Sequence, residues 1–352
     1  MRKVTYVAVA VLAVCWMASP ELAFAGAAIS NGFGLYMGVN DEGHHNILSG
    51  IAGLPANSSF LGLATTFPDG SVRDATSPGC QCEGWGVLGG GISGFANVST
   101  DGGAINLTVD SFTTSGSVAT SFGALPTSAT SSVHLTSLSD LHVTHVYAPS
   151  AATSALFEGT VTISNTGAST ITGIYYRRVM DWDIPPDEFS EYVTHGGLPA
   201  ANVFHMGNNG FATAEPLNYV DGVPGGLTIG GLCGGISPED NNFIDCNGRD
   251  HGTVIDFTFG DLGTGESKTF QIFYGAAPTE LDAFIALGAV GAEVYSLGQW
   301  LGDPTGGTPA TYIFAFKGVG GTPLPEIPEP QYYGLLAAGL AAIYWVRRRR
   351  TA

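Results

Sequence analysis

The feature that most constrains this chain is a series of short segments in which apolar and polar residues alternate. Alternation of this kind places the apolar side chains on one face of an extended strand. Gly, Asn, Asp, Ser and Pro, which favour turns, separate the segments. The pattern predicts an all-β fold, an antiparallel β-sandwich, across residues 26–317. The clearest strand segments are 105–112, 133–138, 141–147, 156–164, 171–183, 253–259, 269–274 and 311–316.

The connections and the single helix follow from shorter signals. Residues 165–167 and 263–267 have the composition of hairpin loops, and the Gly- and Ser-rich segments 84–94 and 113–132 suggest loops and edge strands. A packed C-terminal helix is expected after Thr279, with Asp282 as its capping partner and an apolar stripe that continues to Leu297. A split near 148–156 would divide the body into two lobes, and the sequence leaves one or two lobes open.

The charge balance limits the partners of the body. Residues 26–346 contain six basic and 29 acidic residues, a net charge near −23, because the other basic residues lie at the chain ends. A surface this acidic repels phosphate backbones and anionic headgroups, so we expect no nucleic-acid partner. It suits cations or a hydrated matrix.

The first 25 residues have the organisation of a secretory signal peptide. Arg2 and Lys3 precede an apolar run over residues 4–17, and small residues at Ala23 and Ala25 precede Gly26. The apolar run is too short for a stable membrane span. We therefore expect the chain to be exported through the general secretion machinery, with cleavage before Gly26.

The C-terminal tail combines three elements in a fixed order. A tripeptide, Pro328, Glu329 and Pro330, precedes an apolar transmembrane segment over residues 332–346. A basic cluster follows, formed by Arg347, Arg348, Arg349 and Arg350. A basic cluster after an apolar segment is typical of a cytoplasmic stop. Taken alone, the pattern suggests a C-terminal membrane anchor, preceded by a Pro- and Gly-rich spacer over residues 318–327.

This tail, PEPQYYGLLAAGLAAIYWVRRRR, resembles the PEP-CTERM sorting signal of Gram-negative bacteria that make exopolysaccharide. The resemblance covers residues 328–352. It implies recognition by exosortase, a membrane peptidase thought to cut near the tripeptide. The protein would be anchored transiently in the inner membrane and then released to the cell surface or extracellular matrix, in contact with exopolysaccharide or biofilm. The signal is an address and does not specify what the body does.

Two stretches of the body, FEGTVTISNTGASTITGIYYRRV and FTFGDLGTGESKTFQIFYG, resemble strand pairs of immunoglobulin-like sandwich modules in bacterial surface proteins. The resemblance implies a sandwich and no particular activity, because a fold of this kind hosts many functions.

Four cysteines remain after removal of the signal peptide, namely Cys80, Cys82, Cys233 and Cys246. An even number in an exported protein favours two disulfides. Pairing Cys80 with Cys82 would close a strained ring on an extended strand, so we expect these two to pair with Cys233 and Cys246. A four-thiolate zinc site is the alternative, but the spacing fits it poorly.

Acidic residues gather in the segment MDWDIPPDEFSEY, which includes Asp181, Asp183, Asp187, Glu188 and Glu191. Oxygen-rich loops can bind Ca²⁺, and we take the first four as candidate calcium ligands. A solvated turn or one paired with Arg177 and Arg178 is an open alternative, as is glycoside chemistry. No other cofactor is expected.

The remaining polar signals are weaker. A second polar segment, 239–251, surrounds Cys246 and is the next candidate for a cation. His44 and His45 are adjacent and would diverge on a strand, while His142 and His145 would face opposite sides. We expect every histidine to be structural.

Two functions from different classes remain. The first is a non-catalytic, structural or adhesive surface or matrix protein that exosortase sorts and that associates with exopolysaccharide. The second is a secreted calcium-dependent glycan binder or glycoside-active enzyme that uses the segment from Asp181 to Glu191. The motifs G-x-S-x-G and H-E-x-x-H and the P-loop are absent from the sequence, which favours the first function.

Overall fold

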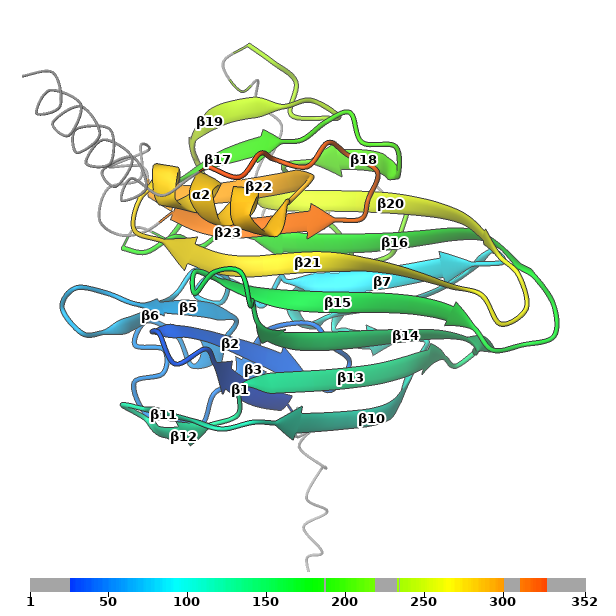
Figure 1. Cartoon of the computed structure of the whole chain (residues 1–352), viewed down its shortest axis with the longest axis horizontal. Helices are drawn as coiled ribbons and strands as arrows, with labels where there is room; N and C mark the ends of the chain where they lie inside the picture. Colours follow the sequence, from blue (N-terminus) through cyan, green and yellow to red (C-terminus); the bar gives the residue numbers. More distant parts are fainter. Residues whose placement is uncertain (1–25, 187, 219–232, 234, 301–310, 328–352) are drawn as a thin grey trace, which may run out of the picture.

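Two large antiparallel sheets dominate the computed structural model, which describes residues 26–186, 188–218, 233, 235–300 and 311–327 (Figure 1). In spatial order the nine-stranded sheet contains β10 (Leu107–Ser115), β13 (Ser128–Leu135), β14 (Leu138–Pro149), β15 (Leu156–Asn165), β21 (Ser267–Ala277), β23 (Thr311–Lys317), β22 (Val294–Trp300), β17 (Glu191–Gly196) and β19 (Phe243–Arg249). The six-stranded sheet contains β18 (Val203–Gly207), β20 (Gly252–Leu262), β16 (Ile171–Asp181), β7 (Gly84–Gly89), β8 (Ile92–Asn97) and β9 (Gly103–Ile105).

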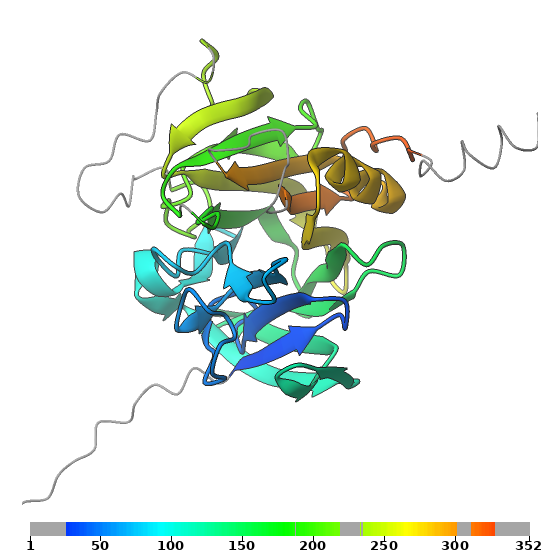
Figure 2. The same ribbon diagram turned by 90° about the vertical axis from the view of Figure 1, so that its left-hand side faces the viewer.

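Smaller sheets extend one end of the molecule. A four-stranded sheet contains β1 (Gly26–Ser30), β2 (Leu35–Asn40), β5 (Leu63–Thr66) and β6 (Val72–Asp74). Two-stranded ribbons pair β3 (Ile47–Leu48) with β4 (Phe60–Leu61) and β11 (Val118–Thr120) with β12 (Gly123–Leu125). Figure 2 shows this part, drawn in blue and dark green, at the opposite end from β19.

One hydrophobic core joins the sheets. Its buried side chains include Val143, Val161 and Ile272 from the nine-stranded sheet and Val87 and Phe257 from the six-stranded sheet. Inward and outward positions alternate along the strands, as in β13, where every second residue from Ala129 onward is buried. The all-β prediction is confirmed, and two sheets over a shared core are the arrangement of a sandwich. Five of the eight predicted strand segments lie wholly within strands. Asn106, with φ +55°, interrupts segment 105–112, a turn at residues 136–137 interrupts segment 133–138, and β16 ends at Asp181 within segment 171–183.

The two loops predicted as hairpins instead cross between the sheets. β15 pairs with β21 in one sheet, and β16 pairs with β20 in the other. The chain therefore passes from one sheet to the other between β15 and β16, and again between β20 and β21. Asn165 stabilises both crossings, because its Nδ2 donates to the carbonyl oxygens of Ser169 at 2.8 Å and Leu262 at 2.9 Å. The hairpin prediction was wrong because loop composition does not reveal which sheet the next strand joins.

The prediction of loops and edge strands over residues 84–94 was also wrong. β7 is an interior strand of the six-stranded sheet, between β16 and β8. Glycine serves this position because a Cβ atom at Gly86 would collide with the carbonyl oxygen of Ala214. The strand therefore needs glycine for close packing, although glycine usually weakens a strand.

Two helices occur in the described residues, the short α1 (Val98–Asp101) and α2 (Glu280–Val290). Thr279 caps α2 as predicted, since its side chain accepts a hydrogen bond from the backbone N–H of Asp282 at 3.1 Å. The helix covers the outer face of β21, β22 and β23, against Phe273 and Ile313 (Figure 1). It ends at Gly291, which has φ +65°. The predicted continuation to Leu297 was wrong, because the left-handed glycine ends the helix and Leu297 belongs to β22.

The segment expected to be a spacer begins as part of the folded body. The carboxylate of Glu293 accepts hydrogen bonds from the backbone N–H groups of Gly318, Val319 and Gly321, at 2.9 to 3.1 Å. Leu324 packs against the buried side chains between α2 and the nine-stranded sheet. The possible boundary near 148–156 falls in the connection between β14 and β15, which are paired neighbours in one sheet.

The expected signal peptide and sorting tail, including the predicted transmembrane segment 332–346, lie outside the described residues. Among the residues that are described, no helix is long and apolar enough to cross a membrane.

A buried ion pair lies between the two large sheets. Arg178 on β16 donates from Nε to Oε1 of Glu83 at 2.6 Å, and both side chains are fully buried. Arg178 also donates to the hydroxyls of Tyr176 at 3.1 Å and Tyr147 at 3.0 Å, while the hydroxyl of Tyr274 donates to Glu83 at 2.9 Å. Burial lowers the pKa of Arg178, but the charge of Glu83 and the hydroxyls of three tyrosines together outweigh burial and raise that pKa well above its ordinary value. The network joins β16 of one sheet to β14 and β21 of the other.

We predict that Glu83→Gln will destabilise the protein by about 3–5 kcal/mol, because it leaves Arg178 buried without a countercharge. Urea denaturation followed by tryptophan fluorescence measures the change. Asp69→Asn is the matched control, since it removes the exposed partner of Arg73. An equal response of the two variants would contradict a central role for the buried pair.

Candidate metal centre

Four carboxylates converge where strands of both sheets end. Asp181 is the last residue of β16, Asp183 follows it, Glu191 begins β17, and Asp250 lies in the turn between β19 and β20. The register brings them together, because Asp181 is paired with Gly252 and Glu191 is paired with Arg249. Asp181, Asp183 and Asp250 each offer one oxygen within 4.8 Å of the other two. These four residues are called the acidic cluster below.

Asp181, Asp183 and Glu191 are buried, Asp250 is half-buried, and no Lys or Arg among the described residues forms a salt bridge with them. Asp183 and Glu191 are 0% exposed and Asp181 is 1% exposed. Both oxygens of Asp183 and of Glu191, and one oxygen each of Asp181 and Asp250, lack a hydrogen-bond partner among the described residues. Burying an ionised carboxylate is costly unless it is paired or binds a metal. The cluster therefore offers the carboxylate oxygens that a cation would need as ligands.

Burial raises the pKa of every member of the cluster, and repulsion between carboxylates adds to the rise for Asp181, Asp183 and Glu191. Burial raises the pKa of Glu191 to about 10, with the charges of Asp183 and Asp250 adding to the effect. Burial alone raises the pKa of Asp250 to about 6. For Asp181 and Asp183 the pKa is raised well above its ordinary value, again first by burial and then by neighbouring carboxylates. A bound cation would reverse these shifts, because it stabilises the ionised forms.

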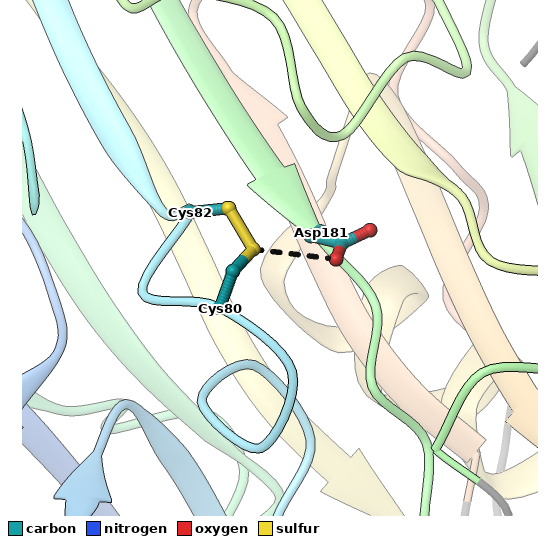
Figure 3. A group of neighbouring side chains, drawn as sticks. All are labelled: Cys80, Cys82 and Asp181. Carbon is teal, nitrogen blue, oxygen red and sulfur yellow. Dashed lines mark hydrogen bonds between the residues drawn. A yellow bond between two sulfur atoms is a disulfide. The ribbon is translucent and has the colours of Figure 1, made fainter. Parts of the chain in front are cut away.

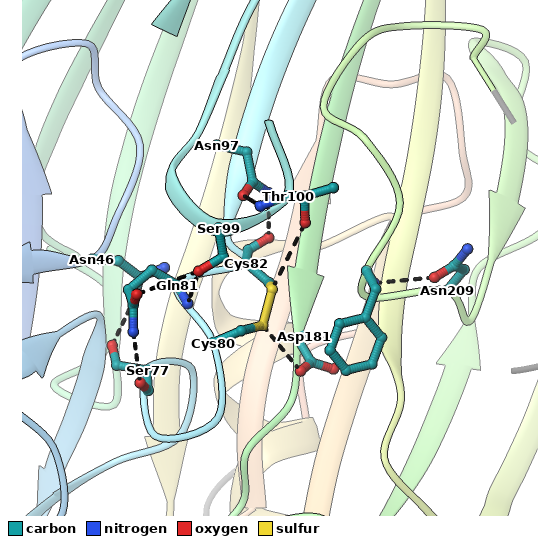
Figure 4. The surroundings of a disulfide bond; sticks show 11 residues. Asn46, Ser77, Cys80, Gln81, Cys82, Asn97, Ser99, Thr100, Asp181 and Asn209 are labelled. Atoms are coloured by element: carbon teal, nitrogen blue, oxygen red, sulfur yellow. Dashed lines mark hydrogen bonds between the residues drawn. A yellow bond between two sulfur atoms is a disulfide. The ribbon is translucent and has the colours of Figure 1, made fainter. Parts of the chain in front are cut away.

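A disulfide between Cys80 and Cys82 lies against the acidic cluster (Figure 3). The Sγ atom of Cys80 lies 3.6 Å from Oδ2 of Asp181. On the other side, Asn97 Nδ2 donates to the carbonyl oxygen of Cys82 at 2.7 Å, which ties the loop to the N-terminus of α1 (Figure 4). The disulfide therefore covers one side of Asp181. It also fixes the conformation of the loop that contains both cysteines.

The expected long-range cysteine pairing was wrong, although the prediction of two disulfides is confirmed. Cys80 pairs with Cys82, and Cys233 pairs with Cys246. In a regular strand, residues two apart have Cα atoms about 6.6 Å apart. Cys80 and Cys82 instead precede β7 in a bent loop that brings their Cα atoms to 5.2 Å, within the range for a disulfide. With all four cysteines paired, the four-thiolate zinc alternative is also wrong.

The structure brings together only part of the predicted calcium set. Asp181 and Asp183 lie in the acidic cluster, whereas Oε1 of Glu188 accepts a hydrogen bond from Asn57 at 3.2 Å. Asp187 lies outside the described residues. Asp250 comes from the second polar segment, 69 positions after Asp181. The sequence predicted the two acidic segments as separate candidates. They come together only through the pairing of β16 with β20, which no local sequence pattern reveals.

The alternative of an arginine-paired or solvated turn was wrong. Arg177 pairs with Asp256 and Arg178 pairs with Glu83, so these two arginines are committed elsewhere. The cluster is also too enclosed for glycoside chemistry, since at most 1% of Asp181, Asp183 or Glu191 is exposed. A sugar must contact both catalytic carboxylates. An atomic cation is the ligand that fits such a space.

The histidines divide into buried and surface groups. His44, His45, His145, His195 and His251 are buried, and burial lowers their pKa values, to about 3 for His44 and His195 and about 4 for His251. His145 points into the core and its Nε2 lies 2.9 Å from the hydroxyl of Tyr176, while His142 is on the outer face. The predicted divergence of His142 and His145 is confirmed.

A scan against protein-family models found no match, and a search of curated proteins found no similar sequence.

We predict that trypsin without reduction will release the two disulfides in separate peptides. No Lys or Arg lies within residues 74–176 or 179–248, so one peptide contains Cys80 and Cys82 and another contains Cys233 and Cys246. Mass spectrometry should find each peptide lighter by two hydrogen atoms than its reduced form. A single species that joins both peptides would instead support the long-range pairing.

Proposed function

We propose that the protein is an exported, non-catalytic surface or matrix protein whose β-sandwich is stabilised by a bound divalent cation of the calcium type. Its route would follow the sequence signals, through the general secretion machinery, transient anchoring in the inner membrane and processing by exosortase. Two disulfides are appropriate to an oxidising compartment outside the cytoplasm. The acidic body would then associate with exopolysaccharide in a structural or adhesive role.

The observation that carries the cation proposal is the set of buried, unpartnered oxygens on Asp181, Asp183 and Glu191. The donors near one another are carboxylates, which favour hard cations such as Ca²⁺. Calcium also accepts six to eight oxygen ligands in flexible geometry, and extracellular modules bind it with Kd of about 10⁻⁴ to 10⁻³ M. A site of that affinity would fill only after export.

A bound cation would connect elements of both sheets. Asp181 ends β16 and Asp250 precedes β20 in the six-stranded sheet, and Glu191 begins β17 in the nine-stranded sheet. Neutralising their charges would remove the repulsion between these strand ends. The role we infer is therefore stabilisation of the fold, and burial of the cluster does not favour direct glycan binding through these carboxylates.

We predict that calcium will raise the Tm, and that the gain will be larger at pH 8 than at pH 5. Without a cation the folded state keeps protons on Glu191, with pKa about 10, and Asp250, with pKa about 6, that the unfolded chain releases at lower pH. The contribution of the cluster to stability therefore falls as pH rises, until calcium replaces the protons. At about 100 times Kd, calcium should add roughly 5 °C at pH 8. Differential scanning fluorimetry with calcium or with a chelator measures the gain.

The Asp183→Asn variant separates cation binding from general stability. The amide replaces a buried carboxyl group whose ionised form is disfavoured without a cation, so the chelator-treated variant should be at least as stable as the wild type at pH 8. Calcium should no longer raise its Tm. Asp140→Asn, at an exposed position, is the control and should retain the full calcium response. A calcium response of Asp183→Asn equal to that of the wild type would sink the assignment.

The export proposal has its own test in the intact mass of the protein recovered from the envelope and from the matrix of its host. We expect a matrix form that begins at Gly26 and ends near Pro330. Retention of Arg347 to Arg350 in every fraction would contradict exosortase processing and indicate a permanent membrane anchor.

A further inference from the structure

Two histidines and an aspartate meet on the outer face of the nine-stranded sheet. Unlike the acidic cluster, this group contains imidazole side chains. His134 on β13 is paired directly with His142 on β14. Asp110 lies on the neighbouring strand β10, where the register shifts between Val109 and Ser111. A bulge of this kind redirects a side chain. Three strands joined as consecutive neighbours therefore present their polar side chains at one point.

The geometry of this group is close and open to solvent. Nδ1 of His134 donates to Oδ1 of Asp110 at 2.7 Å, and Nδ1 of His142 donates to Oδ2 of the same carboxylate at 3.2 Å. The two imidazole rings have centroids 5.5 Å apart. The side chains are 21% exposed for His134, 28% for His142 and 33% for Asp110. A small ion can reach all three without opening the core.

We propose that Asp110, His134 and His142 form a surface binding site for a divalent transition metal of the zinc class. One nitrogen from each imidazole ring and one carboxylate oxygen lie within 4.8 Å of one another. Zinc ligands lie about 2.0–2.2 Å from the metal, so small side-chain rotations bring these three atoms to it. Water would fill the open coordination position. When the metal binds, each neutral imidazole keeps its proton on Nε2 instead of Nδ1, and no oxidant or reductant is needed.

The donor set distinguishes this site from the acidic cluster. Imidazole nitrogen suits Zn²⁺, Cu²⁺, Ni²⁺ and Co²⁺, whereas sites made only of carboxylate oxygen suit Ca²⁺. The site is on the surface of rigid paired strands, so its occupation does not depend on the proposed calcium site. A buried oxygen site and an exposed mixed site would let one chain bind two classes of cation.

The presence of two imidazoles beside one carboxylate distinguishes a metal site from a carboxylate that only accepts hydrogen bonds. His205 provides the comparison within the same chain. Its ring lies 3.2 Å from Glu239 and 3.1 Å from Asp240, so it is a histidine beside two carboxylates. His205→Ala therefore removes one surface imidazole near carboxylates while leaving the proposed site intact.

The test is zinc titration of the full-length chain, purified without a histidine tag and treated with a chelator. Isothermal titration calorimetry is run in saturating calcium, so that calcium occupies any all-oxygen site. We expect His142→Ala and Asp110→Asn each to weaken zinc binding at least about tenfold. His205→Ala should bind zinc as the wild type does. Thermal unfolding of each variant verifies that the exposed substitutions leave the fold intact.

Cobalt provides a direct spectroscopic readout. Co²⁺ bound by two imidazoles should give visible absorption bands that disappear in His142→Ala and persist in His205→Ala. Zinc affinity and cobalt spectra that are unchanged in His142→Ala would overturn the proposal and leave Asp110 as a carboxylate that only bridges two histidines. A calcium response retained in Asp183→Asn would overturn the calcium assignment but would not affect either result, so the two proposals fail independently.

Discussion

The buried ion pair between Arg178 and Glu83 is the interaction on which the arrangement of the sheets depends. Neither charge is stable in an apolar core alone, so each holds the other in place, and three tyrosine hydroxyls complete their hydrogen bonds. These partners come from β14, β16 and β21, and therefore from both large sheets. A shift of either sheet would leave a buried charge uncompensated. The pair selects one register of packing among those that apolar contacts alone would permit.

The same strand carries this constraint to the acidic cluster. Arg177, on the opposite face of β16, pairs with the buried Asp256 of β20 and so fixes how these strands are aligned. That alignment places Asp181 opposite Gly252 and brings the Asp250 turn beside it. Buried arginines thus position buried carboxylates that have no arginine of their own. A cation outside the cytoplasm would supply the missing charge, which links the proposed stability of the body to its proposed destination.

Much of the local structure could be predicted from the sequence. Alternation identified the strands because one face of each meets the core, and Thr279 identified the start of α2 because its hydroxyl caps a free backbone N–H. Other predictions failed for reasons of packing. The interior strand β7 needs glycine at position 86, because a carbonyl oxygen of another segment leaves no space there for a side chain. The Cys80 to Cys82 bond and the end of α2 depend on loop conformations that composition does not encode. Of the proposed cation ligands, Asp181 and Asp183 were predicted together, whereas Asp250 was not joined to them.

By itself the sequence determined the all-β class, the acidic character of the body, the presence of two disulfides and the predicted signals for export and sorting. These properties depend on composition, short-range periodicity and adjacent residues. Tertiary structure alone decided that the loops after β15 and β20 cross between sheets, which cysteines pair, and which acids and histidines meet. The physical reason is that strand pairing joins residues distant in the sequence, as Asp181 meets Asp250 and Asp110 meets His134 and His142. No local pattern specifies those partners, because pairing is selected by the energy of the whole core.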